Sequence, residues 1–170
     1  MAKHQSKPLS LDPVWDRIRS DAKASIAAEP LIGGMVHATI LHHDTLESAL
    51  AYRFAMKLAS GEMSEQLLRE IADEAYANDP SLGEAARADL TAVYERDPAC
   101  HSVLQPLLFF KGFQAVQAYR IGHWLWAAKR RDLAYFIQAR VSEIFGIDIH
   151  PNARIGKGLM IDHAHSIVIG

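Results

Sequence analysis

The chain has 170 residues, of which 49% are hydrophobic and 22% are charged, and this composition is typical of one or two compact soluble domains. Its 18 Lys and Arg residues against 20 Asp and Glu residues leave a net charge of −2, which disfavours binding to nucleic acid or anionic membranes. The single cysteine, Cys100, excludes an intrachain disulfide and favours a reducing, cytoplasmic location. No apolar run approaches the roughly 20 residues of a membrane span, and residues 1–8 lack the apolar core of a signal peptide.

An amphipathic helix is predicted near the N-terminus. Asp12 and Pro13 supply an N-cap and a first-turn proline, and an apolar stripe follows at helical spacing. The stripe consists of Val14, Trp15, Ile18, Ala22 and Ile26. A second helix is expected over residues 31–42.

Capping patterns predict the next three helices. Asp44 with Glu47 matches a capping box that opens a third helix, which ends before Gly61. Ser64 opens the fourth, and Ser81 begins the fifth. The apolar face of the fourth helix is made of Leu67, Leu68, Ile71, Ala72 and Ala75. Short connections indicate antiparallel neighbours in a packed helical domain.

Two further helices complete the predicted helical domain, residues 1–146. A long helix over 104–128 is apolar nearly all round and must therefore be largely buried. A last helix over 133–145 stops at Gly146, a typical C-terminal helix residue.

The periodicity changes after Gly146. Isoleucines recur every six residues, at Ile149, Ile155, Ile161 and Ile167. A six-residue apolar period favours a hexapeptide β-helix, with an irregular β meander as the alternative. Three hexapeptides per coil predict that Ile149 and Ile167 stack. The fold class is therefore α+β, with residues 147–170 as an incomplete β-helix.

One coil cannot bury its own apolar interior, because such repeats stabilise one another by stacking. We therefore expect either a fragment of a longer protein or an open end that a partner covers.

Histidines and carboxylates gather in this C-terminal stretch. The set is Asp148, His150, Asp162, His163 and His165. Such residues suit general-base catalysis, since a carboxylate fixes the tautomer of the imidazole and stabilises its protonated form. They also suit a divalent metal site, and they equally fit a polar surface turn. The spacing does not decide among these three.

Four other residues are weaker candidates. Cys100 beside His101 suggests a thiolate nucleophile, although a buried, idle thiol is the simpler interpretation. Arg120 and His123 lie in the mostly apolar long helix and are candidates for interface contacts, or for a packed arginine and a satisfied core histidine.

The region from Asp97 onward resembles the bacterial serine O-acetyltransferase family. The resemblance rests on Arg96-Asp97-Pro98-Ala99, Pro106-Leu107-Leu108, Lys111-Gly112-Phe113, the run from Gln117 to Trp126, Asp148-Ile149-His150-Pro151 and Asp162-His163-Ala164. Earlier stretches such as Glu74-Ala75-Tyr76-Ala77 are similar to the family's N-terminal helices, so the likeness covers nearly the whole chain. It implies a left-handed parallel β-helix after the helical domain.

The resemblance also implies the roles of individual residues. His163 is expected to act as general base toward the serine hydroxyl, with Asp148 as its orienting carboxylate. Asp97, Pro98 and Asp162 match serine-pocket positions. Acetyl-CoA is the expected co-substrate, with its groove beyond residue 170, and no metal or bound cofactor is expected.

The family further implies a set of partners. L-serine and L-cysteine, the latter as feedback inhibitor, share one pocket. The expected assembly is a homohexamer, a dimer of trimers, and a C-terminal tail absent here docks into O-acetylserine sulfhydrylase. The chain departs from the family by ending after one coil and by His165 in place of a small residue, so we expect half an active site and impaired activity alone.

Two alternatives stand beside the acetyltransferase. One is a metal-dependent hexapeptide hydratase or hydrolase that uses His163, His165 and a ligand from a neighbouring chain. The other is a non-catalytic oligomerisation module.

Overall fold

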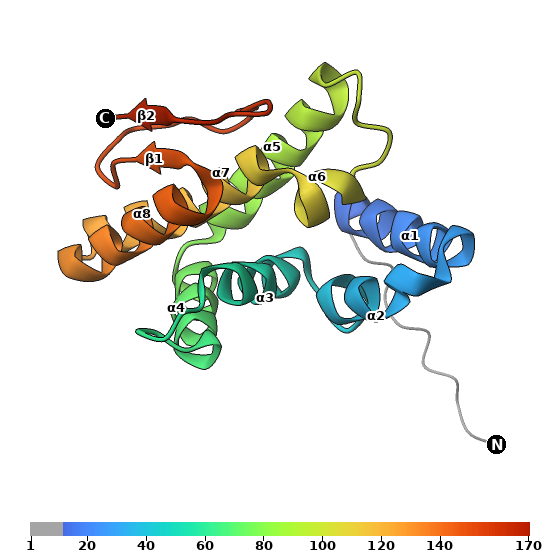
Figure 1. Cartoon of the computed structure of the whole chain (residues 1–170), viewed down its shortest axis with the longest axis horizontal. Coiled ribbons are helices and arrows are strands. Elements are labelled where there is room, and N and C mark those ends of the chain that lie inside the picture. The colour runs from blue at the N-terminus through green and yellow to red at the C-terminus, as the bar shows by residue number, and fades with distance from the viewer. Residues whose placement is uncertain (1–11) are drawn as a thin grey trace.

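A computed structural model describes residues 12–170, which form a mostly helical protein with one two-stranded parallel sheet (Figure 1). The prediction that no signal peptide is present concerns residues 1–8, which lie outside the described residues. Within the described part, every helix is too short or too polar to cross a lipid bilayer.

The first predicted helix is confirmed. Helix α1 spans Pro13–Ala28, and the Asp12 carboxylate caps it by accepting a hydrogen bond from the backbone N–H of Trp15 at 3.1 Å. Trp15, Ile18 and Ala22 of the apolar stripe are buried.

The second predicted helix is wrong as a single element. Three short pieces replace it: the 3₁₀ turn η1 (Pro30–Ile32), α2 (Gly33–Val36) and the π-helical turn η2 (His37–Leu41). Two adjacent glycines, Gly33 and Gly34, lower the helix propensity at the junction between η1 and α2.

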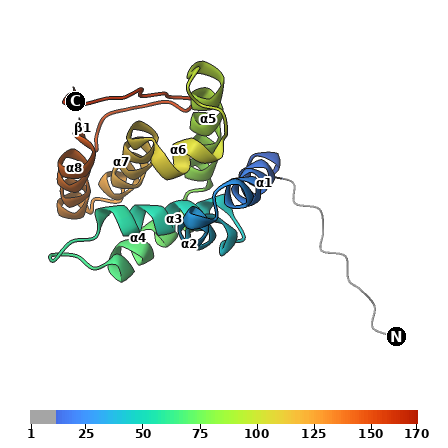
Figure 2. The same cartoon turned by 45° about the vertical axis from the view of Figure 1, so that its right-hand side comes forward.

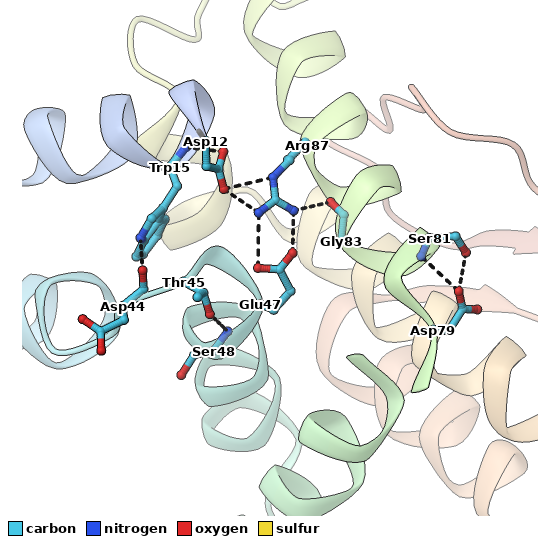
Figure 3. Close-up of polar contacts among 10 residues, drawn as sticks. All are labelled: Asp12, Trp15, Asp44, Thr45, Glu47, Ser48, Asp79, Ser81, Gly83 and Arg87. Atoms are coloured by element: carbon cyan, nitrogen blue, oxygen red, sulfur yellow. Dashed lines mark hydrogen bonds and ion pairs between the residues drawn. The ribbon is translucent and has the colours of Figure 1, made fainter. Parts of the chain in front are cut away.

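Two helices begin at caps other than the predicted ones (Figure 3). Helix α3 (Leu46–Leu58) starts at Thr45 instead of Asp44, because the Thr45 hydroxyl accepts from the Ser48 N–H at 3.2 Å. Helix α5 (Pro80–Arg96) starts at Asp79 instead of Ser81, since Pro80 occupies the first turn. Helix α4 (Glu65–Asn78) begins after Ser64 as predicted, but Leu67 is exposed rather than on the buried face.

One arginine joins the middle of α5 to the starts of two other helices. The Arg87 guanidinium of α5 contacts Asp12 at the start of α1 and Glu47 in α3, each at 2.5 Å (Figure 3). A side chain at Gly83 would collide with Glu47, because an added Cβ would lie 2.2 Å from its carboxylate oxygen. Glycine therefore allows this close approach.

The long helix predicted over 104–128 is two helices. Helix α6 (Leu104–Phe109) and α7 (Lys111–Ala127) meet at Phe110, whose backbone is extended. The break leaves carbonyls of α6 without helical partners, and the Arg53 guanidinium donates to the Leu108 carbonyl at 2.5 Å. Phe109, expected inside, is exposed. Helix α8 (Arg131–Phe145) ends at Gly146 with φ +69°, as predicted.

The C-terminal stretch contains strands β1 (Ile147–Ile149) and β2 (Ile167–Ile169), which pair in parallel. Ile147 pairs with Ile167 and Ile149 with Ile169, so the predicted stacking of Ile149 on Ile167 is wrong. The sequence distance between paired residues of β1 and β2 is two residues longer than three hexapeptides. The two extra residues lie in the irregular connection 150–166.

The core has two parts. One lies among α1, α2, α3, α5 and α6, and the other joins α3, α4, α7 and α8 to the C-terminal stretch. Figures 1 and 2 show the strands over α7 and α8 at one end of the molecule, with α1 and α2 at the other. The C-terminal stretch thus packs on the helical part of the protein.

Candidate active site

An open cleft of about 450 Å³ is lined by the end of α5, the start of α7 and the segment 160–163. Three of the predicted site residues line it: Asp97, Asp162 and His163. The other lining residues are Val93, Ala99, Gln105, Phe109, Phe110, Lys111, Gly112, Phe113, Met160 and Ile161. Residues more than 60 positions apart in the sequence thus share one cavity.

Asp97 is held at the cleft by the turn that follows α5. Its carboxylate accepts a hydrogen bond from the Ala99 N–H at 2.8 Å, and its carbonyl accepts from the Cys100 N–H at 3.0 Å. Only 8% of Asp97 is exposed. Pro98 is exposed and does not line the cleft, and its ring restricts the backbone of the turn.

His163 presents an exposed imidazole beside a carboxylate. Its Nε2 lies 3.6 Å from Asp162 Oδ1, and its backbone has φ +35°. This left-handed conformation is uncommon for a residue with a side chain, and such conformations cluster at functional sites. The geometry leaves the ring accessible to a ligand in the cleft.

Asp148 has a different partner. Its Oδ1 accepts a hydrogen bond from Gln138 Nε2 of α8 at 2.6 Å. Within residues 12–170, no hydrogen bond or ion pair joins Asp148 to His163, and Asp148 does not line the cleft.

The other two histidines of the cluster lie in separate surroundings. The His150 ring packs edge-on against Trp126 and Tyr135, with ring centroids 5.2 and 5.9 Å away. His165 Nδ1 lies 3.4 Å from the Nζ of Lys111, a cleft residue. Across the described part of the chain, no three His, Cys, Asp or Glu side chains converge as a metal site would require.

A buried ion pair that the sequence analysis missed fixes the segment leading into the cleft. Asp89 of α5 is fully buried and pairs with Arg120 of α7 at 2.8 Å. The Asp89 carboxylate also accepts from the backbone N–H groups of Gly158 at 2.8 Å and Leu159 at 2.9 Å. The sequence does contain a signal for this ion pair, because Asp89 is a charged residue within the apolar stripe of α5. The other buried residues of that stripe include Ala86, Leu90 and Val93.

Helix α7 satisfies the carbonyls of the irregular connection from one side. Arg120 Nη2 donates to the Gly156 carbonyl at 2.9 Å, and His123 Nδ1 lies 2.7 Å from the Pro151 carbonyl. Tyr119 donates its hydroxyl proton to the Ala153 carbonyl. Arg120 and His123, candidates either for interface contacts or for a packed arginine and a satisfied core histidine, therefore hold this connection within the same chain.

Gly112 brings the start of α7 against the cleft segment. An added Cβ at this position would lie 2.0 Å from the Ile161 carbonyl oxygen, far inside van der Waals contact. Glycine is therefore required where the backbones approach, and the approach places Asp162 and His163 opposite α7.

Cys100 fits the simpler of its two interpretations. The thiol is buried, and its Sγ lies 3.3 Å from the Ser102 carbonyl. Burial raises the pKa of the thiol, which disfavours the reactive thiolate.

Comparison with known proteins gives one family and a consistent set of relatives. The family model described as serine acetyltransferase, N-terminal, matches residues 14–118. The serine acetyltransferase of Salmonella typhimurium is 51% identical over 160 residues, which are 94% of this chain and 59% of that protein. The chain therefore spans about three fifths of the length of this relative.

Solved structures agree with the sequence matches. A Neisseria gonorrhoeae serine acetyltransferase in complex with serine superposes with a TM-score of 0.91 at 47% identity, over 97% of this chain and 68% of that one. A serine acetyltransferase in complex with CoA gives the same TM-score and identity, over 92% of this chain and 66% of that one.

Proposed function

The chain belongs to the serine acetyltransferase family, and from this premise we propose that the protein transfers the acetyl group of acetyl-CoA to the hydroxyl of L-serine. The products are O-acetyl-L-serine and CoA, and the reaction serves L-cysteine biosynthesis. The observation that carries this proposal is the cleft shared by Asp97, Asp162 and His163. The similarity to serine acetyltransferases supports it over the metal-dependent and non-catalytic alternatives.

The charges of the cleft suit an amino-acid substrate. Asp97 and Asp162 are the two carboxylates among its described lining residues, and together they attract the ammonium group of L-serine. A bound ammonium group fixes the substrate at one end, so that its hydroxyl can be directed to the exposed imidazole of His163.

His163 then acts as the general base. A serine hydroxyl is a weak nucleophile at neutral pH, so the imidazole removes its proton as the oxygen attacks the thioester carbonyl of acetyl-CoA. The new C–O ester bond forms, the C–S bond breaks, and the imidazolium returns the proton to the CoA thiolate. No acyl-enzyme intermediate is needed.

The carboxylate that orients His163 is the second element of the proposal. The family resemblance assigns this role to Asp148. Among the described residues, however, Asp162 is the carboxylate that contacts His163, at 3.6 Å. Replacing each in turn, Asp148→Asn and Asp162→Asn, separates the two roles. Loss of an orienting carboxylate lowers kcat, whereas loss of an ammonium contact raises the KM for serine.

We extend the proposal to the domains and the assembly. Residues 1–146 are the helical domain, and residues 147–170 are the first coil of a left-handed parallel β-helix, supported by the parallel pairing of β1 and β2. The acetyl-CoA contacts correspond to the part of the longer relatives that this chain does not span. The protein is cytoplasmic and assembles as a dimer of trimers. L-cysteine competes for the serine cleft because its thiol replaces a hydroxyl of similar size, and O-acetylserine sulfhydrylase is a partner.

The test is serine-dependent release of free thiol from acetyl-CoA, with a serine-free blank. The chain is assayed alone and joined to the C-terminal remainder of the Salmonella relative. We expect turnover from the joined protein and a reduction of about 10²- to 10⁴-fold in its His163→Ala variant. His101→Gln, an exposed histidine outside the cleft, is the matched control and retains full rate. Full activity of the His163→Ala variant would exclude the proposed base.

A further inference from the structure

A second, much smaller cavity lies inside the helical domain. It is lined mainly by α3 and α7, with one residue each from α4, α6 and α8, and it holds about 20 Å³. Most of its wall is apolar, but Arg53 of α3 and Gln117 of α7 both line it. It is separate from the cleft that contains His163.

Each of these two residues has one buried polar atom without a protein partner. Arg53 Nε and Gln117 Oε1 are both buried, and neither makes a hydrogen bond to a described residue. One other nitrogen of each side chain is paired: Arg53 Nη2 donates to the Leu108 carbonyl, and Gln117 Nε2 donates to Asp89 Oδ2 at 2.8 Å. Buried polar atoms of this kind are nearly always paired with protein or with ordered water.

The orientation of the Gln117 amide follows from its neighbour. Asp89 also accepts from Arg120, Gly158 and Leu159, so its carboxylate oxygens act as hydrogen-bond acceptors. Gln117 must therefore direct its NH₂ group at Asp89. Its Oε1 is then an acceptor that needs a donor from elsewhere.

We propose that this cavity binds one internal water molecule, which accepts a hydrogen bond from Arg53 Nε–H and donates one to Gln117 Oε1. The volume suffices, since one water requires about 10–15 Å³ of such space. A water is both acceptor and donor, which matches the two unpaired atoms. A halide would be repelled by the carbonyl oxygen of Gln117, and a metal cation would be repelled by the Arg53 guanidinium.

The water completes a polar chain between two parts of the fold. It joins Arg53 of α3 through Gln117 to Asp89, and Asp89 holds the backbone of Gly158 and Leu159. Leu159 directly precedes the cleft segment 160–163. The inference does not depend on the proposed reaction, because it rests only on buried atoms of the helical domain and on their hydrogen-bonding capacity.

A crystal structure of the chain at about 1.5 Å resolution tests the proposal. We expect a water peak about 2.8–3.2 Å from both Arg53 Nε and Gln117 Oε1. In solution, the Arg53 Nε–H should show a dipolar cross-peak to a long-lived water. An empty or halide-occupied cavity, or a direct bond between Arg53 Nε and a protein acceptor, would overturn the proposal.

Two variants sharpen the result. Arg53→Met removes the donor, and the water peak should be lost. Lys57 lines the same cavity one helical turn further along α3, and its side chain has no buried unpaired polar atom. The water peak should therefore remain in Lys57→Met. A peak that persists unchanged in Arg53→Met would refute the bridge. If that variant does not fold, the wild-type density and the solution cross-peak decide the question.

Discussion

Replacing Gly112 by alanine should displace the segment that carries His163. The added Cβ would lie 2.0 Å from the Ile161 carbonyl oxygen, and Cβ contacts in proteins are essentially never shorter than 3.0 Å. One of the two backbones must therefore move by at least 1.0 Å. Overpacking of this kind costs about 1–3 kcal/mol of unfolding free energy. If the cleft is catalytic, a 1 Å shift of its residues lowers the rate by about 10²-fold.

The matched control is Gly122→Ala in the same helix. Its added Cβ would meet the Ile137 side chain at 3.7 Å, an ordinary contact, and alanine favours a helix interior by about 0.5–1 kcal/mol. Urea unfolding followed by circular dichroism, at one protein concentration, should show Gly112→Ala destabilised and Gly122→Ala unchanged or stabilised. Equal stability of the two variants would refute the close approach of α7 to Ile161.

Three further predictions concern stability. Asp89→Asn leaves the buried Arg120 without its counter-charge and should lower the free energy of unfolding in urea by about 3–5 kcal/mol. Glu74→Gln, which removes a surface ion pair, should lower it by at most about 1 kcal/mol, and similar losses in the two variants would contradict the burial argument. Ser166 has φ +57°, so Ser166→Gly should raise the unfolding free energy by about 0.5–1 kcal/mol, and a loss would mean that the hydroxyl contributes more than the strain. Burial lowers the pKa of His43 below its ordinary 6.5, so the folded protein disfavours its protonation and stability should fall as the pH drops below 6.5. The unfolding midpoint of His43→Gln should depend less on pH over that window, and an identical slope in both proteins would assign the effect to other groups.

The sequence was informative where the determinant is local. Asp12 and Gly146 were identified as helix boundaries because a capping carboxylate and a left-handed glycine act within one turn of the backbone. The Asp97, Asp162 and His163 positions were identified by family motifs, and the structure places all three at one cleft. Their assigned roles remain predictions.

The fold decided what depends on contacts between distant residues. The apolar pattern over 104–128 contains no signal for the break at Phe110, where the α6 carbonyl finds its donor in Arg53 of another helix. The six-residue isoleucine period likewise contains no signal for the extra residues of the irregular connection, so the register of β1 and β2 differs from the prediction.

By itself, the sequence determined the helical class, several helix ends and the family, because caps, stripes and motifs are encoded within short windows. Only the tertiary structure decided that Asp89 is a buried partner of Arg120 and that Asp148 contacts Gln138. Burial and pairing are properties of a site assembled from several elements, and no short window of sequence contains all of them.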